Sequence, residues 1–246
     1  MDRLVYTAMA GAKSMLDRQS VVANNIANIS TPGFRADISL YRAIPVDGQG
    51  LPTRASTLES SPGSDSSNGP LIDTGRALDI AITGRGWMAV EGADGKEAYT
   101  RAGSFKVGPG GALLTQGGQN VLGDGGPIAL PPDTSISIGR DGTISAIPKQ
   151  PPLTAVTVVG RIKLVDPEDS ALTKGPDGLF RMKDGSTADA SETVSVTAGA
   201  LEGSNVNAAA AMVDMISLAR NYELQMKAIA HGEENDKQAT QLLSTN

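Results

Sequence analysis

The sequence predicts an α+β (mixed) fold. Long N- and C-terminal helices pair as a coiled-coil-like core domain, and a central β-rich domain of short strands and hairpins lies between them in the chain. Near both ends, apolar residues recur at alternating intervals of four and three, the spacing of a helix that packs along a partner helix. In the middle, apolar and polar residues alternate, and Asp-Gly pairs stand between short apolar runs. Such pairs are typical of hairpin turns.

The N-terminal apolar seam consists of Val5, Met9, Ala12, Leu16, Gln19, Ala23 and Ile26. We expect this helix to end near Asn28, because residues 30–33 combine a proline, a pre-proline residue that favours extended geometry and a turn glycine. The apolar start also resembles a secretory signal. However, Asp2 offsets the charge of Arg3 and Lys13 closes the apolar run early, so a helix without a cleaved signal peptide is expected.

The C-terminal seam has the same spacing and consists of Ala208, Met212, Met215, Ala219, Tyr222, Met226 and Ile229. Ser204, Asn205 or Asn207 can cap the start of this helix, which we expect to continue to about Leu243. Gly232 weakens the helix by about 1 kcal/mol without ending it. Isolated helices with such narrow seams are marginal in water, so each needs a partner.

The middle of the chain predicts a β-rich domain over residues 76–204. Strands are expected at residues 78–83, 87–90, 99–101, 135–138, 143–147, 156–165 and 193–197. Residues 60–70 are rich in Ser, Gly and Pro and predict a loop. The expected organisation is therefore a helical core domain (1–40 with 205–246), a connecting segment (41–75) and the β-rich outer domain.

The composition excludes several classes of function. The net charge of −6 without a cluster of Lys or Arg argues against nucleic acid as a partner. No apolar run is long enough to span a membrane. The absence of Cys removes thiolate catalysis, disulfides and Cys-ligated metals. Aromatic residues make up only 3% of the chain, which favours many short strands over a deep enzyme fold.

The candidate chemical motifs are weak. Residues 84–89 fit G-x-G-x-x-A, but a dinucleotide site needs a helix to begin there, whereas Trp87 begins a strand-like run, so a hairpin is favoured. His231 is the single histidine and lies off the seam, beside Glu233 and Glu234. We therefore predict no enzyme activity, no cofactor and no metal site, and interpret the acidic cluster as a solvated helix face.

Asn24, Asn25 and Asn28 are harder to explain, because three asparagines within five positions are poor helix formers. One interpretation is helix termination, with Asn28 at the C-terminal cap. The other is that their amides bond the backbone of a packed neighbour. The sequence leaves both open.

Three blocks resemble a known family. Residues 23–34 (ANNIANISTPGF) resemble the N-terminal signature of the flagellar basal-body rod, hook and hook-associated axial proteins. Residues 78–87 and 99–105 resemble the central motifs of its rod and hook branch, and residues 201–206, 212–216 and 220–223 resemble its C-terminal signature. The opening MDRLVYTAM and the Trp87-Met88 pair are most similar to the proximal rod proteins. Ala211 and Gln225 depart from the common pattern, where many relatives carry glutamate and asparagine.

The resemblance implies a structural subunit of the proximal rod, a periplasmic drive shaft that transmits torque for motility. Its implied partners are copies of itself, other rod proteins, the flagellar type III export apparatus and the surrounding rings, with export that involves no cleaved signal peptide. The residues expected at the assembly interface are Val5, Met9, Leu16, Asn24, Asn25, Ile26, Asn28, Thr31, Pro32, Gly33, Phe34, Leu201, Glu202, Ser204, Asn205, Val206, Met212, Met215, Ile216, Tyr222, Met226 and Ile229.

Two alternatives remain at this point. One is a distal rod or hook-family paralogue. The other belongs to a different class: a secreted β-rich binding module whose helices serve only for dimerisation. The scarcity of aromatic platforms and the paired terminal seams count against the second.

Overall fold

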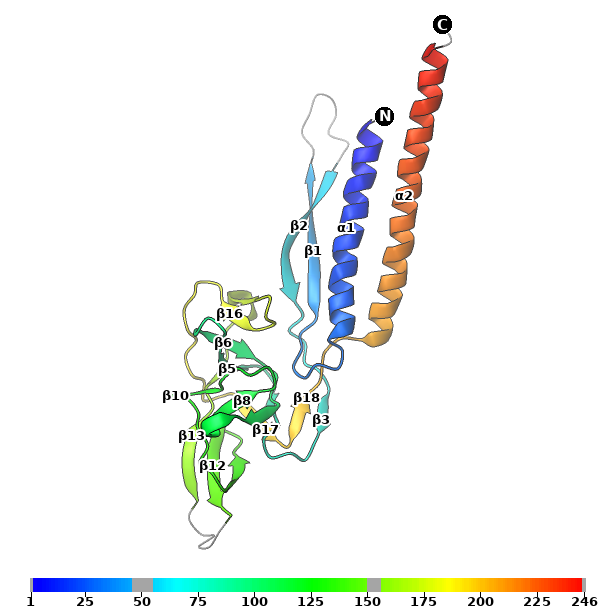
Figure 1. Cartoon of the computed structure of the whole chain (residues 1–246). Helices are drawn as coiled ribbons and strands as arrows, with labels where there is room; N and C mark the ends of the chain where they lie inside the picture. The colour runs from blue at the N-terminus through cyan, green and yellow to red at the C-terminus, as the bar shows by residue number, and fades with distance from the viewer. Residues whose placement is uncertain (1, 46–54, 150–155, 245–246) are drawn as a thin grey trace. The chain divides into compact units, whose positions relative to one another are not determined.

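The structure is a computed structural model that describes residues 2–45, 55–149 and 156–244. Helix α1 spans Asp2–Ala27 and helix α2 spans Ala208–Ser244, with many short antiparallel strands between them in the chain (Figure 1). The predicted α+β fold class is therefore confirmed. No helix among the described residues is both long and apolar enough to cross a membrane.

The chain divides into two compact units. The first, which we call the helical unit, comprises Met1–Asn28, Ala36–Asp65 and Val206–Asn246. The second, the β unit, comprises Ile29–Arg35 and Ser66–Asn205. The short segment that follows α1 thus belongs to the β unit, although the next segment of chain returns to the helical unit.

In the helical unit, α1 contacts both α2 and an antiparallel hairpin of β1 (Asp37–Pro45) and β2 (Ala55–Ser64). Figure 1 shows the hairpin and α2 on either side of α1. The Tyr41 hydroxyl in β1 donates a hydrogen bond to the Ser14 carbonyl at 3.2 Å. The predicted loop was wrong over residues 60–64, because pairing with β1 recruits these weak strand formers into β2.

The seam between the helices differs from the predicted seam at alternate positions. On α1 the buried and half-buried residues include Val5, Ala8, Ala12, Met15, Gln19, Val22 and Ile26. On α2 they include Ala211, Met215, Leu218, Tyr222, Gln225 and Ile229. The predicted members Met9 and Leu16 are instead 53% and 48% exposed, and Met212 and Met226 are 55% and 45% exposed.

The small residues on α1 account for this difference. Ala8 and Ala12 are buried, and a Cβ atom placed on Gly11 would lie only 3.2 Å from Cδ of Gln225. The helices approach each other over these small side chains, and Met9, Leu16, Met212 and Met226 lie exposed one residue along each helix from seam positions.

The β unit is built from short antiparallel strands in several small sheets. The largest has the order β14-β5-β6-β16-β15, and a three-stranded sheet has the order β11-β12-β13. The strands are β3 (Leu71–Asp73), β4 (Ile80–Thr83), β5 (Trp87–Glu91), β6 (Glu97–Thr100), β7 (Phe105–Val107), β8 (Leu113–Thr115), β9 (Leu122–Gly123), β10 (Gly126–Pro127), β11 (Thr134–Ile138), β12 (Thr143–Pro148), β13 (Thr157–Arg161), β14 (Leu164–Val165), β15 (Leu172–Lys174), β16 (Phe180–Met182), β17 (Ser195–Ala198) and β18 (Ala200–Glu202).

Four Asp-Gly pairs form hairpin turns as predicted, between β5 and β6, β9 and β10, β11 and β12, and β15 and β16. Gly95, Gly142 and Gly178 have positive φ in these turns, which glycine adopts without steric penalty. The Asp47-Gly48 pair lies outside the described residues. Residues 84–86 form a turn that leads into strand β5 and not into a helix. The predicted hairpin was wrong, however, because β4 pairs with β17 and β5 with β6 and β14.

Most buried apolar side chains lie in the β unit. The largest core cluster includes Ile80, Met88, Phe105, Leu113 and Ile144. A second cluster contains Trp87, Ala89, Tyr99, Val165, Leu172 and Phe180. This distribution indicates that the β unit has its own core, whereas only Ala8, Ala12 and Leu218 are fully buried hydrophobic residues among those described in the helical unit.

Tyr99 connects this second cluster to a loop. Its hydroxyl donates to Glu97 Oε1 at 2.9 Å and accepts from the Ala188 backbone N–H at 2.7 Å. Glu97 in turn accepts from Lys163 Nζ at 2.8 Å. Burial of the phenol, together with the nearby Glu97 carboxylate, raises the pKa of Tyr99 to about 12.

This shift predicts a loss of stability in alkali. Because the folded pKa lies above the unfolded value of 10.0, the contribution is complete below pH 10 and disappears as the pH rises through 12. We expect the free energy of unfolding of the β unit to fall by about 2 kcal/mol over this range. Urea titrations at pH 9 to 12 measure it. In Tyr99→Phe this part of the pH dependence should vanish; an unchanged slope would contradict the assignment.

Candidate functional site

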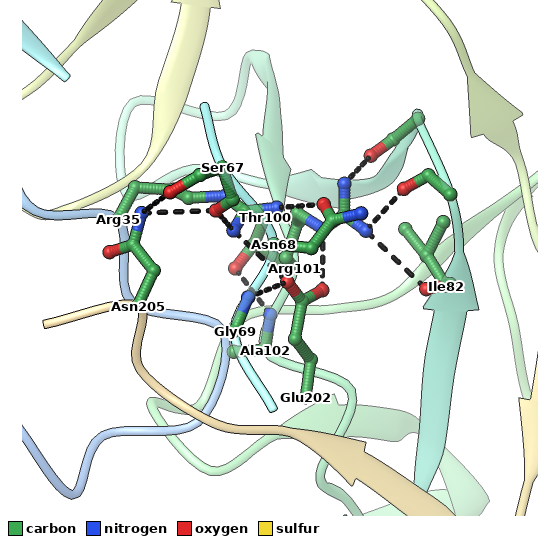
Figure 2. A network of polar contacts seen from close by, with 12 residues as sticks. Arg35, Ser67, Asn68, Gly69, Ile82, Thr100, Arg101, Ala102, Glu202 and Asn205 are labelled. Atoms are coloured by element: carbon green, nitrogen blue, oxygen red, sulfur yellow. Dashed lines mark hydrogen bonds and ion pairs between the residues drawn. The ribbon is translucent and has the colours of Figure 1, made fainter. Parts of the chain in front are cut away.

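The chain leaves α1 and re-enters α2 at one place in the β unit, where a carboxylate is buried between two arginines (Figure 2). Glu202, at the end of β18, accepts from Arg101 Nε at 2.7 Å through Oε2. Its Oε1 lies 3.0 Å from Arg35 Nη1 and accepts from the Gly69 backbone N–H at 2.9 Å. Arg35 and Glu202 are 1% exposed and Arg101 is 4% exposed. We call these three residues the junction cluster.

Backbone carbonyls and one amide complete the junction cluster. Arg101 donates through Nη2 to the Gly84 carbonyl at 2.8 Å and through Nη1 to the Gly86 carbonyl at 3.2 Å. Arg35 donates through Nη1 to the Ser67 carbonyl and through Nη2 to Asn68 Oδ1 at 3.0 Å. These bonds offset part of the large desolvation cost of burying charges. Loss of any one member would leave a buried charge without its partner, so the cluster is sensitive to each of its residues.

The turn after α1 fits against the same cluster. Thr31 to Phe34 form a β-turn, closed by the Phe34 N–H donating to the Thr31 carbonyl at 3.3 Å. Gly33 has φ +68°, the positive φ that a type II turn requires at the residue after Pro32. Its N–H donates to the Glu202 carbonyl at 2.8 Å. A Cβ atom at Gly33 would lie 2.3 Å from the Arg101 carbonyl carbon, so no larger residue fits.

Lys174, the last residue of β15, holds the segment from another side. Its Nζ lies 4.0 Å from the centroid of the Phe34 ring and donates to the Arg35 carbonyl at 2.8 Å. The Asn205 N–H donates to the Phe34 carbonyl at 3.3 Å, and its side-chain amide donates to the Ser67 carbonyl at 3.0 Å. The segments that lead out of α1 and into α2 are therefore bonded to each other within the β unit.

Glu202, Gly33, Phe34 and Asn205 are among the interface residues predicted from the sequence, whereas Arg35, Arg101 and Lys174 are not. One signal could have found the arginines. Each of the three blocks of resemblance contains or adjoins one member of the junction cluster: Arg35 follows the first block, Arg101 lies in the second and Glu202 lies in the third.

The asparagines before the turn perform both of the roles left open. Asn25 pairs reciprocally with the backbone of Asp37, donating to its carbonyl at 2.9 Å and accepting from its N–H at 2.8 Å, and Asn24 donates to the Asp37 carboxylate at 2.6 Å. Asn28 donates to the Asn24 carbonyl at 2.9 Å at the end of the helix. The amides thus cap α1 and attach it to the start of β1 within the same chain.

The remaining predicted interface residues lie along the helices and beside the junction. Thr31, Met9, Leu16, Met212, Ile216 and Met226 are exposed, and Ser204 is buried. Val5, Ile26, Pro32, Leu201, Val206, Met215, Tyr222 and Ile229 are half-buried. Of the three candidate caps, Asn207 caps α2 by accepting from the Ala210 N–H at 3.1 Å.

The side chains considered for chemistry do not form a site in the described part of the chain. His231, Glu233 and Glu234 are exposed on α2. Among the described residues, no three His, Asp or Glu side chains are placed to hold a metal ion.

The fold and the junction define a class of protein. In this class, the segments that follow the N-terminal helix and precede the C-terminal helix are bonded to each other within a β-rich unit. Comparison with known proteins identifies the family. Residues 5–35 match the family described as flagella basal body rod protein, and residues 81–146 match the flagellar hook protein FlgE/F/G D1 domain. Residues 197–242 match the flagellar basal body rod FlgEFG protein C-terminal family.

Full-length relatives agree with these matches. The chain is 48% identical to the flagellar basal-body rod protein FlgF of Escherichia coli and 46% identical to that of Salmonella typhimurium, with 99% of each chain covered in both cases. It is 32% identical to the rod protein FlgG of Agrobacterium fabrum over 94% of this chain and 96% of the relative. The chain belongs to the flagellar basal-body rod protein family, which confirms the resemblance seen in the three sequence blocks, and it is similar to FlgF over its full length.

We predict that Glu202→Gln destabilises the β unit by roughly 3–5 kcal/mol, because two buried guanidinium groups lose their carboxylate while the side chain keeps its size. Urea unfolding of the β unit measures the change. Glu168→Gln is the control, since Glu168 is exposed and should change stability by less than about 0.5 kcal/mol. Equal effects of the two substitutions would contradict a structural role for the cluster.

The turn glycine gives a second test. Gly33→Val meets both the penalty of positive φ and the Arg101 backbone, whereas Gly75→Val meets a similar φ of +65° with nothing within 4 Å of its Cβ. We expect Gly33→Val to lower the urea midpoint of the β unit much more than Gly75→Val, and to prevent rod assembly in cells while export continues. Similar midpoints, or swimming cells with Gly33→Val, would refute the close approach.

Proposed function

We propose that the chain is a structural subunit of the proximal flagellar rod, where it assembles through its terminal helices into the periplasmic drive shaft that transmits torque. The observation that carries this proposal is a second apolar stripe, left exposed on both helices after the helices have paired. Similarity over the full length to FlgF proteins, which are named basal-body rod proteins, supports the same conclusion.

On α1 the exposed stripe contains Tyr6, Met9 and Leu16, which follow helical spacing with Lys13 between the last two. On α2 it contains Met212, Ile216 and Met226, and Val213 and Leu224 are exposed elsewhere on the same helix. Several large apolar side chains exposed along one helix are typical of interaction sites. Each such side chain contributes about 1.5–3 kcal/mol when it is fully buried, so contacts with neighbouring subunits can stabilise an assembly without any catalytic chemistry.

Charge favours packing between α1 and α2 of neighbouring copies as well as within one chain. Helix α1 (Asp2–Ala27) carries three basic and two acidic residues, a net charge of +1, and α2 (Ala208–Ser244) carries three basic and five acidic residues, a net charge of −2. Lys13 lies on the exposed stripe of α1, and Glu223 lies between Ile216 and Met226 on α2. Exposed pairs contribute only about 0–1 kcal/mol each, so they select the orientation of packing more than its strength.

The domain assignment follows from this proposal. We propose that residues 1–40 and 205–246 form the coiled-coil-like helical core and residues 76–204 the outer domain, except that Ile29–Arg35 belong to the β unit. Residues 41–75, the expected connection, include most of the β1–β2 hairpin and strand β3. The proposed partners are copies of this chain, other rod proteins and the surrounding ring proteins, after export through the flagellar type III apparatus without a cleaved signal peptide. Identity to FlgF above that to FlgG supports the proximal rather than the distal position.

Met226→Asp tests the exposed stripe. The Met226 side chain is 45% exposed in the single chain, so we expect its replacement to leave the folding of the monomer unchanged. In an assembly the same charge is buried without a partner at a cost of several kcal/mol per subunit, so rods should fail to form and cells should not swim. Circular dichroism of the purified chain and motility of the cells measure the two effects.

Glu234→Gln, at an exposed position of the same helix, is the control, and cells that carry it should swim normally. Met215 lies in the seam between α1 and α2 of one chain, so Met215→Asp should also disturb the folding of the monomer. Normal swimming with Met226→Asp would mean that the stripe does not pack in the rod.

A further inference from the structure

The sequence contains a single Asn-Gly pair, Asn68-Gly69, and this pair is bonded to the junction cluster (Figure 2). Asn68 is exposed, and its Oδ1 accepts from Arg35 Nη2 at 3.0 Å. The Gly69 N–H donates to Glu202 Oε1 at 2.9 Å. A Cβ atom at Gly69 would collide with the Gly203 carbonyl oxygen, so the fold requires glycine at this position. The fold therefore places after Asn68 the residue that makes an asparagine most reactive.

Asn-Gly pairs deamidate without an enzyme, because glycine has no side chain to hinder attack by its own nitrogen. In the first step, base removes the proton from the Gly69 nitrogen. The nitrogen then attacks Cγ of Asn68, so that the N–Cγ bond forms, the Cγ–Nδ2 bond breaks, and Nδ2 leaves as ammonia with a proton from water. Water finally opens the resulting succinimide at either carbonyl and gives aspartate or isoaspartate.

The junction cluster opposes the first step, whichever base removes the proton. If hydroxide removes it, a nitrogen anion is left 2.9 Å from the Glu202 carboxylate, and like charges at this distance repel. If Glu202 removes it, the carboxylate between two buried guanidinium groups is neutralised, which is strongly unfavourable. The hydrogen bond from Arg35 polarises the Asn68 carbonyl and favours the second step, but that step cannot begin before the proton has left.

We propose that Asn68 is a deamidation site, which the junction cluster holds unreactive while the β unit is folded and which reacts when the cluster opens. Isoaspartate adds one methylene to the main chain and so moves the Gly69 N–H away from Glu202. A chain that has reacted in this way does not rebuild the same junction. The proposal concerns the single chain and does not rest on the rod function.

The competing explanation is that Asn68, as an exposed residue, deamidates in the folded chain like any unrestrained Asn-Gly pair. An internal reference distinguishes the two explanations. Asp124→Asn creates a second Asn-Gly pair in the turn between β9 and β10, where residue 124 is exposed and nothing lies within 4 Å of a Cβ atom at Gly125. Both pairs lie in the β unit, so unfolding of this unit affects them equally.

The test follows both pairs in the full chain that carries Asp124→Asn. The chain is incubated at mildly alkaline pH, either folded or unfolded in urea, and its peptides are analysed by mass spectrometry. In the folded chain we expect position 68 to deamidate at least about tenfold more slowly than position 124. In urea the two rates should come close to each other. Chains with isoaspartate at position 68 should be depleted from the fraction that refolds when urea is removed.

Glu202→Gln in the same background tests the cause, because it removes the negative charge and keeps the size of the side chain. Leu113→Ala is the matched control, since Leu113 is fully buried in the largest core cluster and its truncation destabilises the β unit without changing the charges of the junction cluster. The two variants are compared at equal fractions of unfolded chain, set with urea. Relative to position 124, position 68 should react at least about threefold faster in Glu202→Gln than in Leu113→Ala.

Equal rates at positions 68 and 124 in the folded chain would overturn the proposal. Equal relative rates in Glu202→Gln and Leu113→Ala would also overturn it, because folding alone, and not the carboxylate, would then protect Asn68. If Glu202→Gln does not fold, the comparison of the two pairs in the folded chain still decides whether the site is held unreactive.

Discussion

The contact between the Glu202 carboxylate and the two arginines is the constraint on which the rest of the structure depends. Arg101 lies 101 residues before Glu202 in the chain, and Arg35 lies further away still. Desolvating any one of these groups alone is unfavourable, so the cluster is stable only when all three segments are in place. Ion pairing between distant segments therefore makes the folding of the β unit cooperative. The segments that connect this unit to both terminal helices take part in that folding.

The β unit and the helical unit differ in how they bury their apolar side chains. The β unit buries its apolar side chains within its own small sheets, with Phe105, Leu113 and Ile144 fully inaccessible. The helical unit buries chiefly alanines and Leu218 and leaves larger side chains in solvent. In the function that we propose, the β unit supplies a stable support and the helices supply surface for neighbouring subunits. Gly33 and Lys174 matter in this scheme because they fix where the chain leaves the support.

Local patterns in the sequence predicted much of the fold, because their causes are local. The seams located both helices, residues 30–33 located the end of α1, and the Asp-Gly pairs located four hairpin turns. Strands of two or three residues, such as β9 and β18, were missed because so few residues carry no measurable period. The junction cluster was missed for a different reason. An ion pair between residues as distant as Arg35 and Glu202 leaves no periodic pattern near either residue, and only the position of its members in or beside the three blocks of resemblance could have indicated it.

The error in the helix seam has a physical cause that also bears on function. A heptad pattern is recognised by its large apolar side chains, and these selected Met9, Leu16, Met212 and Met226. Helices that approach closely need small residues at the contact, so the chain's own seam combines Ala12, which was predicted, with Ala8 and Ala211 at the alternate positions. Two stripes, one residue apart, are therefore present on each helix. Of the large apolar residues in the predicted pattern, Met9, Leu16, Met212 and Met226 remain exposed in the single chain, which is why we assign these to contacts between subunits.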